Sequence, residues 1–210
     1  MSAKEEILGR IRSALADAPA AEEVPREYRT SSEMTEEQLI DLLVDRLVDY
    51  KAGVDVIEAA QIPDFVAAKL DQASSVVYPH GLDTGWLSAL PQDIARRIDE
   101  PGARLSVAEL DETSAVVTSS AVSIAESGTI ILDGEPDQGR RAISLVPDHH
   151  VCIVPVSTIV QLLPEAMPRL TVTRPLTWIS GPSATSDIEL ERVEGVHGPR
   201  VLDVLLVRGL

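Results

Sequence analysis

Apolar positions change their spacing several times along the chain, and each change marks an expected element. Near the N-terminus, four apolar residues recur at helical spacing: Ile7, Leu8, Ile11 and Leu15. This pattern predicts a short amphipathic helix over residues 3–16. Residues 35–38 (Thr-Glu-Glu-Gln) match a capping box and precede two apolar rows, so a second helix is expected to begin near Thr35.

From residue 54 onward, short apolar runs alternate with helical segments. In the first half we expect strands at 54–57, 75–78 and 115–118, helices at 62–70 and 84–98, and an extended run at 104–107. In the second half we expect strands at 122–125, 129–132, 143–146, 151–155, 177–179 and 201–207, and helices at 157–163 and 186–192. The alternation predicts an α/β fold with a mixed, mostly parallel sheet and helices on both of its faces.

The segment between the first two helices has a different composition. Residues 17–32 contain two prolines and several glutamates, which is typical of a tether with little structure. We therefore expect an N-terminal helix and acidic tether over residues 1–34 and one α/β domain over residues 35–210. Because an isolated helix this short is marginal in water, the first helix is expected to pack on a partner or a neighbouring subunit, which leaves a homo-oligomer open.

Composition narrows the range of functions. Hydrophobic residues make up 44% of the chain but only six residues are aromatic, so the core must be aliphatic, as in buried parallel strands. The formal charge of −16 argues against binding to nucleic acid or to an anionic membrane, since both require a basic surface. No apolar run is long enough to span a membrane and the N-terminus is charged, so we expect a cytoplasmic protein.

Cysteine usage limits the redox chemistry. Cys152 is the only cysteine, so the chain can form no internal disulfide and cannot supply the four ligands of an iron–sulfur cluster. Neither a Walker motif nor a dinucleotide-binding glycine fingerprint is present, and the identity of any cofactor stays open. If this protein serves a redox pathway, another subunit must carry the electrons.

Two candidate sites lie in glycine-containing turns of the middle region. Glu126 follows an apolar strand and precedes Gly128 and Thr129, so a carboxylate able to act as base or nucleophile stands where a ligand can approach closely. The alternative is an ordinary turn between hairpin strands. In the loop 134–141, Arg140 and its neighbour Arg141 stand out in so acidic a chain, although a solvated loop is the alternative.

Two further candidates lie near the C-terminus. The strand at 177–179 runs into a loop whose candidate ligand-binding residues are Gly181, Ser183, Thr185 and Asp187. Backbone N–H groups and hydroxyls at such a loop can hold an anion, whereas the alternative is a plain strand-to-helix turn. In the turn 195–200, His197 can act as acid or base, Gly198 leaves room beside it, and Arg200 can hold a carboxylate or phosphate. The alternative is a structural loop.

Other combinations of these residues are weaker. His149 and His150 are adjacent in an expected strand and should point to opposite faces, so we expect no metal site there. Ser183, Asp187 and His197 include the residue types of a hydrolytic triad, but the chain has no Gly-x-Ser-x-Gly elbow. The preferred hypothesis places Glu126, the loop at 181–187 and the turn at 195–200 around one pocket, with Arg200 holding an anionic group and His197 as proton donor.

Four motifs in order resemble the lactate utilization protein C family. They are Ile-Ala-Glu-Ser-Gly-Thr at 124–129, Ser-Leu-Val-Pro-Asp-His-His at 144–150, Ile-Ser-Gly-Pro-Ser at 179–183 with Asp-Ile-Glu at 187–189, and Gly-Val-His-Gly-Pro-Arg at 195–200. The resemblance covers about residues 118–207 closely. It departs from the usual pattern at Ser127, where threonine is common, and in the acidic tether. It implies a LUD-type domain with the fold of the ribose-phosphate isomerase, glucosamine-phosphate deaminase and CoA-transferase group.

The resemblance also implies a function. It implies a subunit or accessory protein of a system that oxidises L-lactate to pyruvate beside iron–sulfur partner subunits, with a small carboxylate or an anionic cofactor bound by the C-terminal half. In the CoA-transferase branch of the fold, a glutamate followed closely by glycine is the nucleophile, and Glu126 with Gly128 looks similar. Two alternatives therefore remain: an independent transferase or isomerase acting through Glu126, and a non-catalytic scaffold or sensor that binds an organic acid.

Overall fold

The computed structural model describes residues 2–17, 24–185, 193–194 and 197–210. Its centre is a six-stranded sheet in the order β1-β12-β7-β4-β2-β3, in which every neighbouring pair is parallel. The strands are β1 (Gly53–Glu58), β2 (Ser75–Pro79), β3 (Ala95–Asp99), β4 (Ala115–Thr118), β7 (His149–Pro155) and β12 (Val201–Arg208). The predicted α/β fold with a mostly parallel sheet is confirmed.

A second, smaller sheet carries part of the C-terminal half. It has the order β8-β5-β6-β9, with β5 (Val122–Ile124), β6 (Thr129–Leu132), β8 (Ile159–Val160) and β9 (Thr177–Ile179). The β5–β6 and β6–β9 pairs are antiparallel, and β5 pairs with β8 in parallel. A two-stranded pair, β10 (Ala184–Thr185) and β11 (Val193–Glu194), completes the strands of the described residues.

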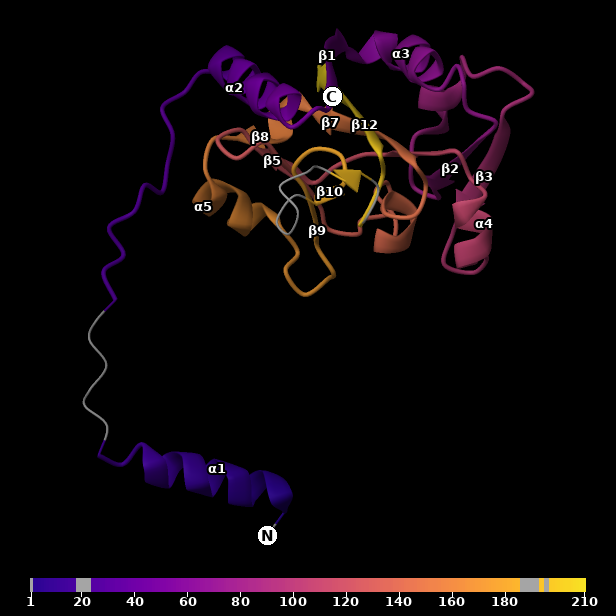
Figure 1. Ribbon diagram of the computed structural model, residues 1–210. Helices are drawn as coiled ribbons and strands as arrows, with labels where there is room; N and C mark the ends of the chain where they lie inside the picture. The colour runs from indigo at the N-terminus through magenta and orange to yellow at the C-terminus, as the bar shows by residue number, and fades with distance from the viewer. Residues whose placement is uncertain (1, 18–23, 186–192, 195–196) are drawn as a thin grey trace.

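Helices cover both faces of the six-stranded sheet (Figure 1). The α-helices are α1 (Ala3–Ala14), α2 (Glu36–Asp49), α3 (Ile62–Lys69), α4 (Val107–Asp111) and α5 (Leu163–Ala166). Short 3₁₀ helices are η1 (Ala59–Gln61), η2 (Thr84–Leu87), η3 (Arg141–Ser144), η4 (Val156–Thr158) and η5 (Met167–Arg169). Thr35 caps α2 through a capping box with Gln38, as the sequence predicts.

Alternation along the central strands separates two layers of core. On β7, Val151 and Ile153 join a cluster with α3 and η2, whereas Cys152 and Val154 join a cluster with α2 and the smaller sheet. All four of these side chains are fully buried. A strand that is buried on both faces has a nearly continuous apolar sequence. For this reason the apolar runs at 151–155 and 201–207 predicted β7 and β12 correctly. α5 packs on the outer face of the smaller sheet.

Several expected elements are wrong. The helix expected at 84–98 is the short η2 followed by the edge strand β3. Most residues of β3 are exposed, so its sequence resembles the polar face of a helix. Residues 143–146 belong to η3 and the turn after it rather than to a strand. The helix expected at 157–163 is η4 and β8, and the expected extended run at 104–107 ends where α4 begins. The helix expected at 186–192 lies outside the described residues.

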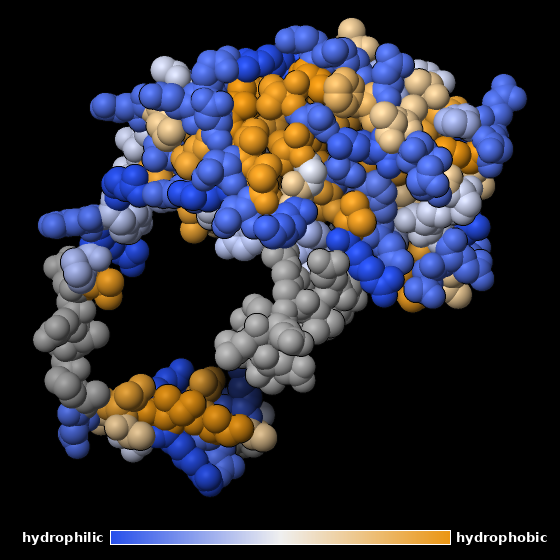
Figure 2. All heavy atoms as spheres, turned by 45° about the horizontal axis from the view of Figure 1, so that its top comes forward, coloured by the Kyte–Doolittle hydropathy of each residue, from blue (hydrophilic) through white to orange (hydrophobic). Residues whose placement is uncertain are grey.

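The N-terminal helix buries none of its side chains in this chain. Ile7, Ile11 and Leu15 are 49–59% exposed and share one apolar face, which Figure 2 shows along α1. Further along, the tether touches the domain: Arg29 pairs with Glu126, and the Ser32 hydroxyl donates to Gln161. In the part of the chain that the structure describes, no helix is both long enough and apolar enough to cross a membrane.

Candidate functional site

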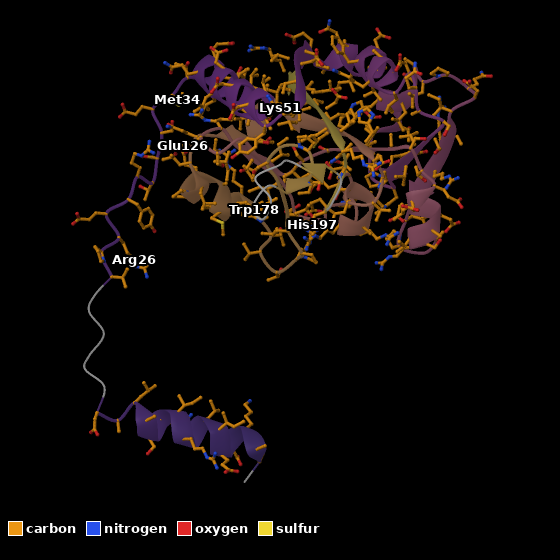
Figure 3. All side chains as sticks on the ribbon, in the orientation of Figure 1. Arg26, Met34, Lys51, Glu126, Trp178 and His197 are labelled. Atoms are coloured by element: carbon orange, nitrogen blue, oxygen red, sulfur yellow. The ribbon has the colours of Figure 1, made fainter. Side chains whose placement is uncertain are left out.

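Three of the four predicted segments contribute residues to one small pocket, the His197 pocket, with a volume of about 290 Å³. Its wall comes from η3, from the first residues of β7 and β12, from β9, and from the loop and turn near the C-terminus. The lining residues are Arg141, Ser144, Leu145, His150, Thr177, Trp178, Ile179, Ser180, Gly181, Pro182, Ser183, His197, Gly198, Pro199 and Leu202. Figure 3 shows Trp178 and His197 close together in the view.

Hydrogen bonds fasten the loop to the turn. The backbone N–H of Ser183 donates to the carbonyl of Pro199 at 2.8 Å, and the backbone N–H of His197 donates to the Ser183 hydroxyl at 2.8 Å. Gly181 adopts a φ of +84°, and a Cβ there would lie 2.6 Å from Cβ of Tyr50 at the end of α2. Glycine is therefore required for the loop to pass this helix end.

The buried part of the pocket is formed by a neutral histidine. His150 is fully buried, and its Nε2 lies 2.8 Å from the Thr118 hydroxyl, whereas its Nδ1 has no partner among the described residues. Burial, with a smaller effect of neighbouring His149, lowers the pKa of His150 to about 3. Burial likewise raises the pKa of the Cys152 thiol to about 12, so this layer is uncharged near neutral pH.

His149 and His150 point to opposite faces of β7, as the sequence predicts. His149 is bonded to Asp203 at 2.8 Å, and Asp203 also pairs with Lys69 of α3, on the other side of the sheet from His150. Burial acts to raise the pKa of Asp203, but the hydrogen bonds from His149 and Lys69 outweigh it and hold this pKa below its usual value. Across the described residues, no group of three His, Cys, Asp or Glu side chains is arranged to hold a metal ion.

The Glu126 segment reaches the His197 pocket only indirectly. The Thr129 hydroxyl is hydrogen-bonded to the Ser180 hydroxyl at 2.9 Å, which links β6 to the loop. Gly128 has a φ of +61°, and a Cβ there would lie 2.7 Å from Cβ of Arg46 on α2. Glu126 itself does not line the pocket: it pairs with Arg29 at 2.5 Å, and Figure 3 places it near Met34 and away from His197.

The remaining predicted residues lie in other surroundings. Arg200 is exposed, pairs with Asp148 at 3.2 Å, and does not line the pocket. Thr185 belongs to β10, whose backbone pairs with β11. Asp187 lies outside the described residues. Arg140 lines a different pocket, where its Nε and Nη2 donate to the two carboxylate oxygens of buried Asp99 at 2.8 Å each.

That second cavity, the arginine pocket, has a volume of about 570 Å³. Its lining residues are His80, Asp99, Glu100, Pro101, Arg104, Gly134, Glu135, Pro136, Gly139, Arg140, Arg141, Ala142, Arg174 and Pro175. Arg141 lines both pockets, so η3 forms part of the wall of each. The arginine pocket lies at the carboxyl ends of β2 and β3, and the His197 pocket at the amino ends of β7 and β12.

Sequence reasoning identified one side of the arginine pocket and missed the other. Arg140 and Arg141 were conspicuous because they are adjacent basic residues in an acidic chain. Arg104 and Arg174 belong to no motif, and Asp99 and Glu100 come directly after the helix expected at 84–98, the last part of which is in fact β3. A correct strand assignment for 95–99 would have placed the end of β3 beside the end of β2.

Comparisons with known proteins agree with the resemblance. A family model described as the LUD domain matches residues 53–207. A curated protein named lactate utilization protein C from Deinococcus radiodurans is 45% identical over 209 residues, covering 98% of this chain and 95% of that protein. One of the same name from Bacillus velezensis is 28% identical, covering 86% of this chain and 83% of that protein.

A solved structure extends the agreement to the fold. The crystal structure of a DUF162-family protein from Deinococcus radiodurans matches with a TM-score of 0.69 and 37% sequence identity. The match covers 83% of this chain and 99% of that chain. With a family model that spans most of the sequence and a relative similar over nearly its full length, the chain belongs to the LUD-domain family.

Proposed function

We propose that this chain acts in lactate utilization by binding a small carboxylate, lactate or pyruvate, in the His197 pocket. Two things support the proposal. Relatives that share 45% and 28% of their residues with this chain are named lactate utilization protein C. The pocket is also small, about 290 Å³, and it combines a cation, hydroxyls and imidazoles, which are the groups that recognise a hydroxy or keto acid.

The observation that carries the proposal is the position of Arg141. Its guanidinium makes no ion pair with another described residue, it is exposed, and it lines a pocket that also holds His197 and Ser183. A guanidinium matches a carboxylate with two parallel N–H···O bonds. The oxygen on the second carbon of lactate or pyruvate would then meet the imidazole of His197 and the nearby hydroxyls, and the neutral His150 adds no competing charge.

The electrons of lactate oxidation must leave through another protein. Converting lactate to pyruvate releases two electrons and two protons, and one cysteine cannot hold an iron–sulfur cluster of the usual four ligands. We therefore include in the proposal that the chain works beside iron–sulfur subunits, binding the organic acid while those subunits accept the electrons. Glu126 is less suited to a transferase or isomerase, because its carboxylate pairs with Arg29 and it lines neither pocket.

Isothermal titration calorimetry with L-lactate and with pyruvate tests the proposal. The change Arg141→Ala should weaken binding at least tenfold, because a charge-assisted hydrogen bond contributes roughly 1.5–3 kcal/mol. Arg169→Ala is the matched control, because Arg169 is an exposed arginine that lines neither pocket. Arg200→Ala separates the two candidate anion binders: if this variant loses binding and Arg141→Ala does not, the carboxylate is held by the turn and the proposal is wrong.

A further inference from the structure

The arginine pocket occupies a position where open parallel sheets bind ligands. From β2 the chain passes to β3 on one side, whereas from β4 on the other side it continues to β7 and then to β12. The direction of the winding therefore reverses between β2 and β4. In such folds, ligands bind outside the carboxyl ends of the strands near this reversal, and the arginine pocket lies at the carboxyl end of β2, on the side of β3. His80 follows β2 directly and Glu100 follows β3, and both line the pocket.

The charge in the pocket is unusual for this chain. Four arginines line one cavity of a protein whose formal charge is −16. Arg140 is neutralised by Asp99, and Arg174 pairs with Glu135. Arg104 and Arg141 make no ion pair with any other described residue, against the single unpaired carboxylate of Glu100. Unpaired guanidiniums beside a cavity in an acidic protein point to an anionic ligand.

The loop that carries two of these arginines is firmly built. The backbone N–H of Gly81 donates to the carbonyl of Pro136 at 2.9 Å, which ties the loop to the end of β2. The backbone N–H of Asp133 donates to the buried side chain of Gln138 at 2.7 Å. Gly139 has a φ of +70°, and a Cβ there would lie 2.7 Å from Ile143 and 2.8 Å from Pro79. The pocket wall is thus a packed surface.

The volume of the arginine pocket indicates a ligand larger than a three-carbon acid. The volume is about 570 Å³, roughly twice that of the His197 pocket and within the range of cavities that hold cofactor-sized molecules. We propose that the arginine pocket binds an organic ligand carrying a diphosphate group, whose phosphate oxygens are held by Arg104 and Arg141. Arg140 and Arg174 are each paired with a carboxylate, so they form part of the pocket wall and add little net charge. The organic part of the ligand occupies the remainder of the cavity.

This ligand and the small carboxylate share one contact. Arg141 lines both pockets. A diphosphate bound to Arg141 would therefore leave its guanidinium less available to a carboxylate in the His197 pocket. Arg104 lines the arginine pocket and not the His197 pocket. Arg104 is therefore the residue whose substitution tests the new site separately.

Calorimetric titration of the full chain with inorganic pyrophosphate and with ADP tests the proposal. We expect saturable binding of both, with ADP binding at least as tightly as pyrophosphate because its organic part fills the cavity. Arg104→Ala should weaken both at least tenfold, and the control Arg169→Ala should weaken neither. Arg104 makes no ion pair among the described residues, so its loss should leave the melting temperature unchanged.

Several results of this titration would contradict the proposed diphosphate site. No saturable binding of either probe, equal weakening by Arg104→Ala and Arg169→Ala, or unchanged binding in Arg104→Ala would each overturn the site. ADP binding weaker than pyrophosphate would overturn the organic part of the ligand. Titration of Arg104→Ala with pyruvate keeps this proposal separate from the carboxylate site, because pyruvate affinity should be unchanged there whichever way the diphosphate experiment ends.

Discussion

His150 should make the stability of the protein fall as the pH drops below neutrality. Its imidazole is fully buried and has one unpartnered nitrogen among the described residues, and burial lowers its pKa to about 3. An unfolded chain exposes the same imidazole with a pKa of about 6.5, so below that pH the unfolded state takes up a proton that the folded state excludes. The stabilisation is present above pH 6.5 and is lost progressively as the pH falls toward 3.

The size of the effect follows from the two pKa values. Between pH 7.5 and pH 5, protonation favours the unfolded state by about 2 kcal/mol through His150 alone, since each unit of pKa difference that is crossed is worth about 1.4 kcal/mol. That amount is a large part of the roughly 5–15 kcal/mol that stabilises a typical domain.

Urea denaturation followed by circular dichroism at pH 7.5 and pH 5 measures the effect. Carboxylates also contribute to the pH dependence, so the comparison uses His150→Gln, whose amide can still reach the Thr118 hydroxyl but does not titrate. The wild-type protein should lose about 2 kcal/mol more unfolding free energy between the two pH values than the variant does. Equal losses in the two proteins would refute the reasoning and show that His150 accepts a proton in the folded state.

Three other changes have defined outcomes. Gly181→Ala should lower the unfolding free energy by at least about 1–2 kcal/mol, because φ is +84° and the new Cβ meets Tyr50. The control Gly102→Ala, whose Cβ would have nothing within 4 Å, should leave the unfolding free energy unchanged in urea denaturation. Equal effects of the two changes would contradict this. Leu43→Ala removes a fully buried side chain of α2 and should cost roughly 2–5 kcal/mol in the same assay, and a loss under 1 kcal/mol would show that α2 packs loosely. Removing residues 1–17 should leave the melting temperature nearly unchanged, because α1 buries no side chain; a drop of several degrees would show that the helix belongs to the core.

The central strands could be predicted from sequence because they are buried on both faces. The apolar runs of β7 and β12 are typical of buried strands, and the capping box at Thr35 marks the start of α2 equally clearly. Edge strand β3 was missed because its residues face solvent on most sides, which removes the apolar signal. Sequence alone also could not separate the smaller sheet from the larger one, since short apolar strands look alike in either.

The same limits apply to the candidate site. The loop at 181–183 and the turn at 197–199 were predicted together because each is a glycine-containing turn next to a strand, and they share the His197 pocket. Glu126 has the same local pattern, yet its hairpin lies in the smaller sheet, where it meets Arg29 of the tether. Which loops meet depends on strand order, and strand order is set by long-range packing that no local motif records. The roles of these residues in binding remain predictions.

The most direct test of carboxylate binding in the His197 pocket is the fluorescence of Trp178. The chain has two tryptophans; Trp178 lines this pocket and is 44% exposed, whereas Trp86 belongs to η2 and packs against the core. In a Trp86→Phe protein all tryptophan emission comes from Trp178, and titration with L-lactate should change it along a saturable curve. Adding Arg141→Ala should shift that curve to concentrations at least tenfold higher. A strictly linear response, or the same curve with and without Arg141, would contradict the assignment of lactate to this pocket.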